Sequence, residues 1–211
     1  MIPTKEEMNK ALEMRHGKEL NNRFSRATVA VCGLGGLGSN ISISLARAGV
    51  GKLILIDFDE VDVTNLHRQQ YKVHQVGMEK TKAMEENLQE ISPYITVEAI
   101  SVKINEENAQ SLLQEADIIC EAFDQADQKA MLVNIVLEKM PDKYLVAASG
   151  MAGIGTTNSI KTRRIAKKFY LCGDGTSDVA DNHGLFSARV MLCAAHQAHT
   201  VLRILAGEFD T

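Results

Sequence analysis

The sequence predicts an α/β protein with a Rossmann-like, mainly parallel sheet and helices on both faces, extended by a few C-terminal strands and a long final helix. The first observation behind this prediction is that short apolar runs alternate with helical patterns along most of the chain. The second is a glycine-rich turn, Gly33-Leu-Gly-Gly-Leu-Gly38, placed between the first apolar run and the first helical pattern. Such alternation implies right-handed crossovers between parallel strands.

Composition and charge are those of an ordinary globular protein. The chain has 211 residues, 45% hydrophobic and 24% charged, which is enough for one domain with a substantial core. A net charge of −4 argues against nonspecific nucleic-acid binding, which needs clustered positive charge. Because the sequence contains no apolar run of about 18 residues and begins with polar residues, we expect no membrane span, no signal peptide and a cytoplasmic location.

Cysteines and histidines do not form a metal-binding pattern. Cys32, Cys120, Cys172 and Cys193 lack close paired spacing, so we expect a reduced chain with neither a disulfide framework nor a zinc site. His196 and His199 lie three residues apart in a helical pattern, but no third ligand accompanies them, which favours surface or core histidines.

Two regions are expected: an N-terminal helical arm over residues 1–27 and a nucleotide-binding domain over residues 28–211. The arm has Met8 and Leu12 on one helical face, and it could pack on its own domain or reach a second subunit. Arg15 is the polar residue of interest there, although the pattern alone favours a simply solvated arginine.

The first half of the domain is read from apolar runs and helix ends. Residues 28–32 and 52–56 are continuous apolar runs, typical of strands covered on both faces. Between them a helix is expected over residues 39–48, ended by Gly49. A second helix beginning near Lys80 has an apolar side and is ended by Pro93. Strands then follow over residues 95–100 and 117–121, separated by a helix over residues 106–115.

The second half continues the pattern and then changes. A helix over residues 126–139, stopped by Pro141, precedes a strand over residues 144–149. An exposed strand is expected over residues 156–164, and a short strand over 169–171. Residues 172–182 are expected to form a polar, mobile loop, and residues 185–205 a long helix rich in Ala and Leu.

The glycine turn indicates a nucleotide site. Gly33 allows the tight turn, Gly35 lets a phosphate approach the backbone, and Gly38 lets helix and strand pack closely, with Gly36 between them. The N–H groups at the helix start suit an anionic phosphate. Asp57 lies 19 residues after Gly38, at a strand end where a carboxylate can accept ribose hydroxyls.

Further polar residues follow the expected strands at the edge where open α/β sheets bind ligands. They are Asp57, Asp59, Asn65, Arg68 and Gln69 after the second strand, and Asp124 after the strand over 117–121. Lys80 lies at a helix start, where a cation is unfavourable with the helix dipole. It is therefore either solvated or held for an external anion.

Together these motifs resemble the ThiF/MoeB/HesA family, whose fold is shared by the adenylation domains of ubiquitin-activating enzymes. Within that family the chain is most similar to the shorter ThiF-like proteins of thiamine biosynthesis. The likeness rests on the glycine turn, Asp57-Phe-Asp59, Asn65-Leu-His-Arg-Gln69, Lys80 and Asp124, and it continues in the last helix up to Gly207.

The resemblance implies an adenylyltransferase that activates the C-terminal glycine carboxylate of a small β-grasp sulfur carrier protein ending in Gly-Gly. ATP and Mg²⁺ would be its cofactors. Asp57 would hold the ribose, Asn65, Arg68 and Lys80 would contact the phosphates, and Asp124 would bind Mg²⁺ or orient the triphosphate. A homodimer is also implied, in which an N-terminal arginine, here Arg15, reaches the neighbour's ATP.

Two departures from the family pattern and two rival functions remain. The paired C-x-x-C zinc motifs of longer relatives are absent, so no structural zinc is expected. The family's sulfur-linking cysteine has no aligned counterpart. Cys172 could replace it or could simply be a small buried side chain.

Two alternative functions are considered. One is a related tRNA threonylcarbamoyladenosine dehydratase, whose RNA substrate could bind the five basic side chains of residues 161–168. The other is an NAD-dependent oxidoreductase.

Overall fold

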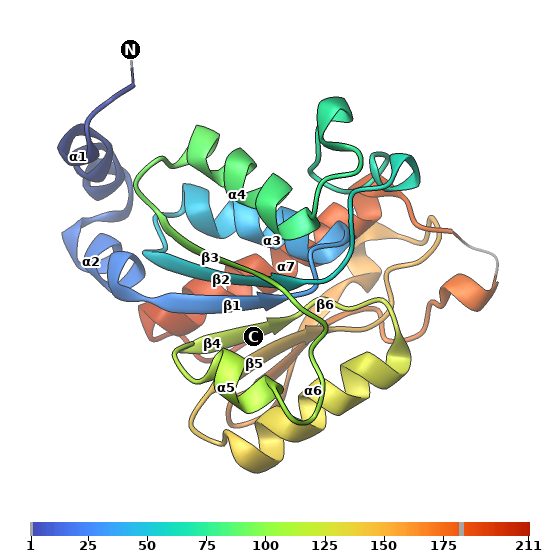
Figure 1. The fold of residues 1–211 in the computed structure, drawn as a ribbon. Coiled ribbons are helices and arrows are strands. Elements are labelled where there is room, and N and C mark those ends of the chain that lie inside the picture. Colours follow the sequence, from blue (N-terminus) through green and yellow to red (C-terminus); the bar gives the residue numbers. More distant parts are fainter. Residues whose placement is uncertain (1, 182–183) are drawn as a thin grey trace.

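A computed structural model describes residues 2–181 and 184–211 and contains a seven-stranded sheet (Figure 1). The strand order is β3-β2-β1-β4-β5-β7-β6, and every neighbouring pair is parallel except β6 and β7. The strands are β1 Thr28–Cys32, β2 Lys52–Asp57, β3 Thr96–Ser101, β4 Ile118–Glu121, β5 Tyr144–Ala148, β6 Lys161–Ala166 and β7 Phe169–Gly173. The predicted Rossmann-like α/β fold is confirmed.

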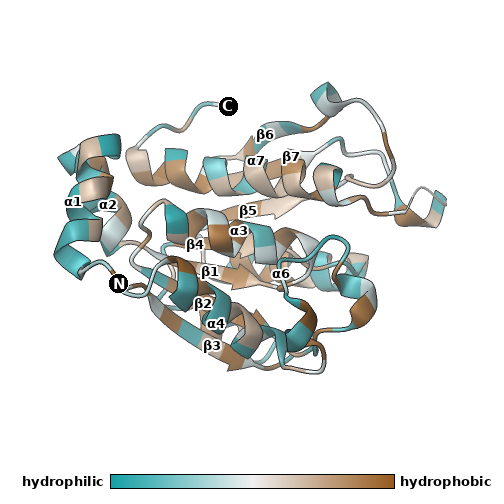
Figure 2. Ribbon diagram, turned by 90° about the horizontal axis from the view of Figure 1, so that it is seen from above, coloured by the Kyte–Doolittle hydropathy of each residue, from teal (hydrophilic) through white to brown (hydrophobic). Residues whose placement is uncertain are grey.

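Helices cover both faces of the sheet. In Figure 1, α3, α4 and α7 lie over one face and α5 and α6 over the other. Their bounds are α3 Gly36–Arg47, α4 Lys80–Ile91, α5 Ala109–Leu113, α6 Ala126–Lys139 and α7 Ser187–Ala206. The inner strands β1, β2, β4 and β5 are almost wholly buried, whereas the edge strands β3 and β6 are partly or largely exposed. Burial of the inner strands produces two apolar cores, one on each face. Figure 2 shows hydrophobic residues along the strands and a mixture of hydrophilic and hydrophobic residues along the helices that cover them.

The N-terminal arm consists of two helices rather than one, α1 Lys5–His16 and α2 Lys18–Arg26. Gly17 breaks the helix because its backbone has a φ of 82°. The arm packs on its own domain: Phe24 is buried, and its carbonyl accepts the N–H of Gly51, just before β2. The arm therefore lies beside the N-terminal ends of the strands (Figure 1).

Two elements differ markedly from those predicted. A strand was expected over 156–164, but Thr157–Ser159 forms a 3-10 turn and the strand begins only at Lys161. The helix expected over 106–115 is reduced to α5, because the side chains of Asn105 and Asn108 bond to nearby backbone N–H groups and hold a turn before it. Within the part of the chain that the structure describes, no helix has both the length and the apolarity to cross a membrane.

Candidate active site

The glycine turn is held closely against the sheet. Gly33 has a φ of 91°, and its N–H donates to the Ile56 carbonyl over 2.8 Å. A side chain at Gly38 would collide with the Gly33 carbonyl, so only glycine lets α3 approach β1 this closely. Gly35 is the N-cap of α3 and no side chain caps that helix end, which leaves backbone N–H groups to bind an external acceptor.

Asp57 ends β2 and contacts this turn directly. Its Oδ2 accepts the Leu34 N–H over 2.5 Å, and its Oδ1 accepts the Asp59 N–H over 2.8 Å. Burial raises the pKa of Asp57, while Lys80 and the two N–H groups counteract that rise. The carboxylate is therefore oriented by the backbone before any ligand arrives.

Lys80, the first residue of α4, is fixed by an ion pair with Asp59, with 2.7 Å between Nζ and Oδ2. The lysine side chain is only 7% exposed, so its charge is held at the helix start by this partner. Of the two interpretations of Lys80 from sequence, free solvation is excluded by that burial.

Arg68 and Gln69 belong to the segment that connects β2 to α4. Within this segment they come soon after the short turn Val63–Asn65. Asn40 anchors the segment, because its side-chain amide donates to the carbonyls of Gly36 and, more weakly, Arg68. Burial lowers the pKa of Arg68, and the nearby carboxylate of Asp124 opposes that change. Gln69 is buried, and its Oε1 has no hydrogen-bond partner among the described residues.

These residues line one cavity of about 570 Å³ at the C-terminal ends of β1, β2, β3, β4 and β5. Ten of the predicted site residues lie along it: Gly33, Gly35, Gly36, Asp57, Asp59, Asn65, Arg68, Gln69, Lys80 and Asp124. Gly38 lies behind the turn, where it shapes the wall. The lining combines glycine N–H groups and two cations, the buried Lys80 and the half-buried Arg68, with the carboxylates of Asp57, Asp59 and Asp124. This combination suits a ligand that has both phosphates and hydroxyls.

Two further predicted residues lie outside this cavity. Arg15 is exposed on α1, which lies at the opposite end of the strands, so this chain does not bring it to its own site. Cys172 was placed in the loop after β7, but it belongs to β7 itself and is fully buried. Burial raises the pKa of the Cys172 thiol, and the structure therefore favours the small buried side chain over a sulfur nucleophile.

One buried ion pair beside the cavity was not predicted from the sequence. Glu121 ends β4 with 1% exposure, and Lys129, on the first turns of α6, bonds both of its oxygens at 2.9 and 3.0 Å. Lys129 also donates to the Ala148 carbonyl and lines the cavity. The sequence contains one hint of this pair, because Glu121 is a carboxylate at the end of an apolar run and a buried carboxylate needs a partner. The sequence does not show which cation is that partner.

A second, larger groove of about 760 Å³ lies between α7 and β6. It contains His196 and His199 but none of the glycine-turn residues. His196 Nδ1 lies 3.0 Å from the Thr162 hydroxyl, so that ring bonds a side chain of the neighbouring strand. Among residues 2–181 and 184–211, no three His, Cys, Asp or Glu side chains are grouped so as to hold a metal ion.

Known proteins resemble the chain at both the sequence and the fold level. A sulfur carrier protein adenylyltransferase from Thermus thermophilus is 39% identical over 109 residues, 51% of this chain and 40% of that protein. A tRNA threonylcarbamoyladenosine dehydratase from Bacillus subtilis is 34% identical over 142 residues, 66% of this chain and 55% of that protein. The chain thus spans about half the length, or less, of these curated relatives.

Among solved structures, the E. coli tRNA N6-threonylcarbamoyladenosine dehydratase in complex with ATP superposes with a TM-score of 0.87 and 20% identity, covering 99% of this chain and 98% of that one. E. coli MccB with ATP has a TM-score of 0.74 and 21% identity, covering 95% and 64%. At these identities the likeness shows the fold. The model of the ThiF family matches residues 9–211, nearly the whole chain, and the protein therefore belongs to the ThiF family.

Proposed function

We propose that the protein is an ATP-dependent adenylyltransferase that activates a carboxylate. The observation that carries this proposal is the convergence of the glycine turn, Asp57, Arg68, Lys80 and Asp124 on one cavity. An oxidoreductase would need the turn and Asp57, but it gives no reason for the cations Arg68 and Lys80 and the further carboxylate of Asp124 at the same edge. The relatives that bind ATP in solved structures are consistent with this choice of nucleotide.

In the proposed reaction, a carboxylate oxygen of the substrate attacks the α-phosphorus of ATP. A new P–O bond forms, the bond between the α-phosphorus and the bridging oxygen breaks, and pyrophosphate leaves with that electron pair. The protein has little covalent work to do. Its task is to hold the reactants in line and to stabilise the charge that develops on phosphate oxygens, which preorganised Arg68, Lys80 and the α3 N–H groups can do.

Mg²⁺ fits the residues present. It takes oxygen ligands, keeps several waters and needs only one or two carboxylates, so Asp124 together with substrate phosphates would be sufficient. When bound, the ion would supply charge neutralisation on the triphosphate.

For the substrate, we propose the C-terminal Gly-Gly end of a small β-grasp sulfur carrier protein of thiamine biosynthesis. The likeness to the Thermus sulfur carrier protein adenylyltransferase supports this choice. A homodimer belongs to the same proposal, because Arg15 can reach a nucleotide only in another subunit.

A second candidate is a tRNA threonylcarbamoyladenosine dehydratase, which would adenylate a carboxylate on tRNA. Two observations favour it: the full-length fold match to the E. coli dehydratase and the Bacillus relative. In addition, β6 and the turn after it carry Lys161, Arg163, Arg164, Lys167 and Lys168 at the edge of the sheet. Basic residues also protect an edge strand from aggregation, so this feature alone does not decide between the candidates.

Exchange of labelled pyrophosphate into ATP separates the two. We expect a ThiS-type carrier ending in Gly-Gly to stimulate exchange and the same carrier without its last glycine to do nothing. Stimulation by tRNA carrying threonylcarbamoyladenosine, and not by the carrier, would establish the dehydratase instead. No exchange with either substrate would refute carboxylate adenylation.

A further inference from the structure

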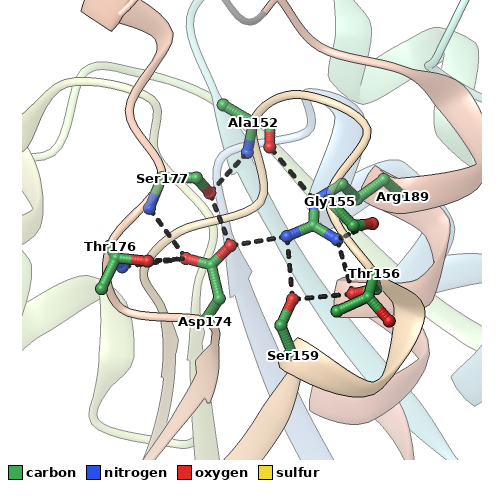
Figure 3. A network of polar contacts seen from close by, with 8 residues as sticks. All are labelled: Ala152, Gly155, Thr156, Ser159, Asp174, Thr176, Ser177 and Arg189. Carbon is green, nitrogen blue, oxygen red and sulfur yellow. Dashed lines mark hydrogen bonds and ion pairs between the residues drawn. The ribbon is translucent and has the colours of Figure 1, made fainter.

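Arg189, in the first turn of α7, is a buried cation that does not line the active-site cavity. It forms an ion pair with Asp174, 2.5 Å between Nη2 and Oδ2, and the two side chains are 7% and 9% exposed. Burying such a pair has a desolvation cost that is offset only when the remaining donors and acceptors are also bonded. Figure 3 shows that they are.

The rest of the Arg189 guanidinium binds the segment that follows β5. Its Nε donates to the Ala152 carbonyl over 3.1 Å, and Nη1 donates to the carbonyls of Gly155 and Thr156 over 2.9 and 3.2 Å. Nη2 also donates to the Ser159 hydroxyl over 3.2 Å. Only the planar fork of arginine can direct this many donors at once, and a lysine ammonium at the same position cannot.

Asp174 organises the loop that follows β7. Its Oδ1 accepts the N–H groups of Thr176 and Ser177 over 2.8 Å, and its Oδ2 accepts the Ser177 hydroxyl over 2.8 Å. These bonds and Arg189 outweigh the effect of burial and hold the pKa of Asp174 far below its usual value. The Ser177 hydroxyl in turn accepts the Ala152 N–H over 3.1 Å, so the network joins both segments.

The two joined segments form part of the cavity lining. Residues 150–152 and 177–179, here called the substrate wall, line it from the side of β5 and β7. The glycine turn, Asp57 and Asp124 line it from β1, β2 and β4. Gly150 has no side chain, and those of Ala152 and Ser177 are small, so at these three of its six positions the wall leaves room for a thin, extended chain entering beside the nucleotide.

We propose that Arg189 and Asp174 are positioning residues that hold the substrate wall in place for the acyl substrate, the extended carboxylate-ended chain that is adenylated. This inference rests on the proposed function. The network touches none of the nucleotide-binding residues named above, and it therefore sets the path of the acyl substrate without setting the affinity for ATP.

Arg189→Lys tests the network, with Arg203→Lys as matched control. Arg203 lies on the same helix and pairs with Asp210, but that pair is exposed. Initial rates of pyrophosphate exchange are measured against ATP and against a ThiS-type carrier ending in Gly-Gly. In Arg189→Lys we expect the KM for the carrier to rise about tenfold or more, since small misplacements are costly, and the KM for ATP to stay within about twofold. Hydrogen exchange at Ala152 and residues 174–177 should become faster.

Asp174→Asn provides a second, milder variant if Arg189→Lys does not fold, because the amide oxygen still accepts the Thr176 and Ser177 N–H groups. It should show the same rise in the KM for the carrier. Equal losses toward ATP and carrier, unchanged kinetics, or the same split in Arg203→Lys would overturn the positioning role. If the wild-type protein itself shows no carrier-stimulated exchange, the proposed substrate is wrong, and this inference fails with it. That result is distinct from failure of the positioning role alone, in which the wild type responds to the carrier but the variants do not show the expected change in KM.

Discussion

Lys80 and Asp59 form a half-buried ion pair at the active-site cavity, with Nζ 2.7 Å from Oδ2, a lysine side chain 7% exposed and a carboxylate 49% exposed. The Lys80 N–H also donates to the Asp59 carbonyl over 2.9 Å. The cation is thus fixed where the helix dipole alone would repel it. The pair keeps a positive charge in position beside the cavity.

Lys80→Met is therefore expected to weaken ATP binding about 10- to 100-fold, because a charged hydrogen bond to a phosphate is lost. Lys82→Met is the matched control. Lys82 lies on the same helix and pairs with Glu79, but its side chain is 66% exposed and does not line the cavity. Calorimetric titration with ATP measures both. Equal affinities in the two variants would exclude Lys80 from the phosphate site.

Arg68→Ala and Asp124→Ala are expected to reduce the exchange rate by about 10²-fold or more while the protein stays folded. Preorganised charges of this kind contribute about 3 kcal/mol each to the transition state. Arg47→Ala and Asp127→Ala serve as controls, because both residues lie outside the cavity lining. Near-normal exchange by Arg68→Ala and Asp124→Ala with carrier present would contradict the proposed site.

The sequence predicted the sheet and most of this cavity because both depend on local signals. Apolar runs give the strands, and the C-terminal ends of parallel strands gather at one edge, so Asp57 and Asp124 could be placed together without coordinates. Cys172 was misplaced because a glycine-bearing polar stretch after it made the end of β7 look like a loop. Arg189 was missed because its partners follow β5 and β7, and no periodicity links those segments to the start of α7. Residue 182, the end of the predicted mobile loop, lies outside the described residues.

The buried pair predicts a specific pH dependence. The pKa of Asp174 is lowered from 3.8, so its stabilisation is present above that value and is lost as the pH falls below it. Burial raises the pKa of Asp57 and Glu121, so the contribution of these two groups to the unfolding free energy changes with pH in the opposite direction. A comparison of Asp174→Asn with wild type isolates the first effect. At pH 7 we expect the variant to lose about 3 kcal/mol of unfolding free energy, with the difference shrinking toward pH 3.

Urea unfolding at several pH values from 7 to 3 measures this difference. Asp210→Asn is the control, because the Arg203–Asp210 pair is exposed and should contribute less than about 1 kcal/mol. If the difference in unfolding free energy between Asp174→Asn and wild type stays constant over the whole pH range, then the pKa of Asp174 is not lowered in the folded protein.

Nucleotide choice is the fourth prediction. We expect ATP with Mg²⁺ to bind and NAD to produce no measurable heat, because Arg68 and Lys80 sit beside Asp57 in a site suited to a triphosphate. Removing Mg²⁺ with a chelator should weaken ATP binding, since the metal shares the phosphate charge. Tight NAD binding without a response to ATP would overturn the adenylyltransferase proposal and favour an oxidoreductase.

The final prediction concerns assembly. Arg15 is exposed on an arm at the N-terminal ends of the strands, whereas the cavity lies at their C-terminal ends, so a role at a nucleotide requires a second copy of the chain. We expect a homodimer by sedimentation at micromolar concentration, and Arg15→Ala should lower the exchange rate. Mixing it with inactive Asp124→Ala then tests whether Arg15 acts between subunits. In a mixed dimer, the site with an intact Asp124 receives Arg15 from its neighbour, so exchange should rise well above the average of the two separate variants. A monomer, or a mixture no more active than that average, would show that Arg15 does not serve a neighbouring site.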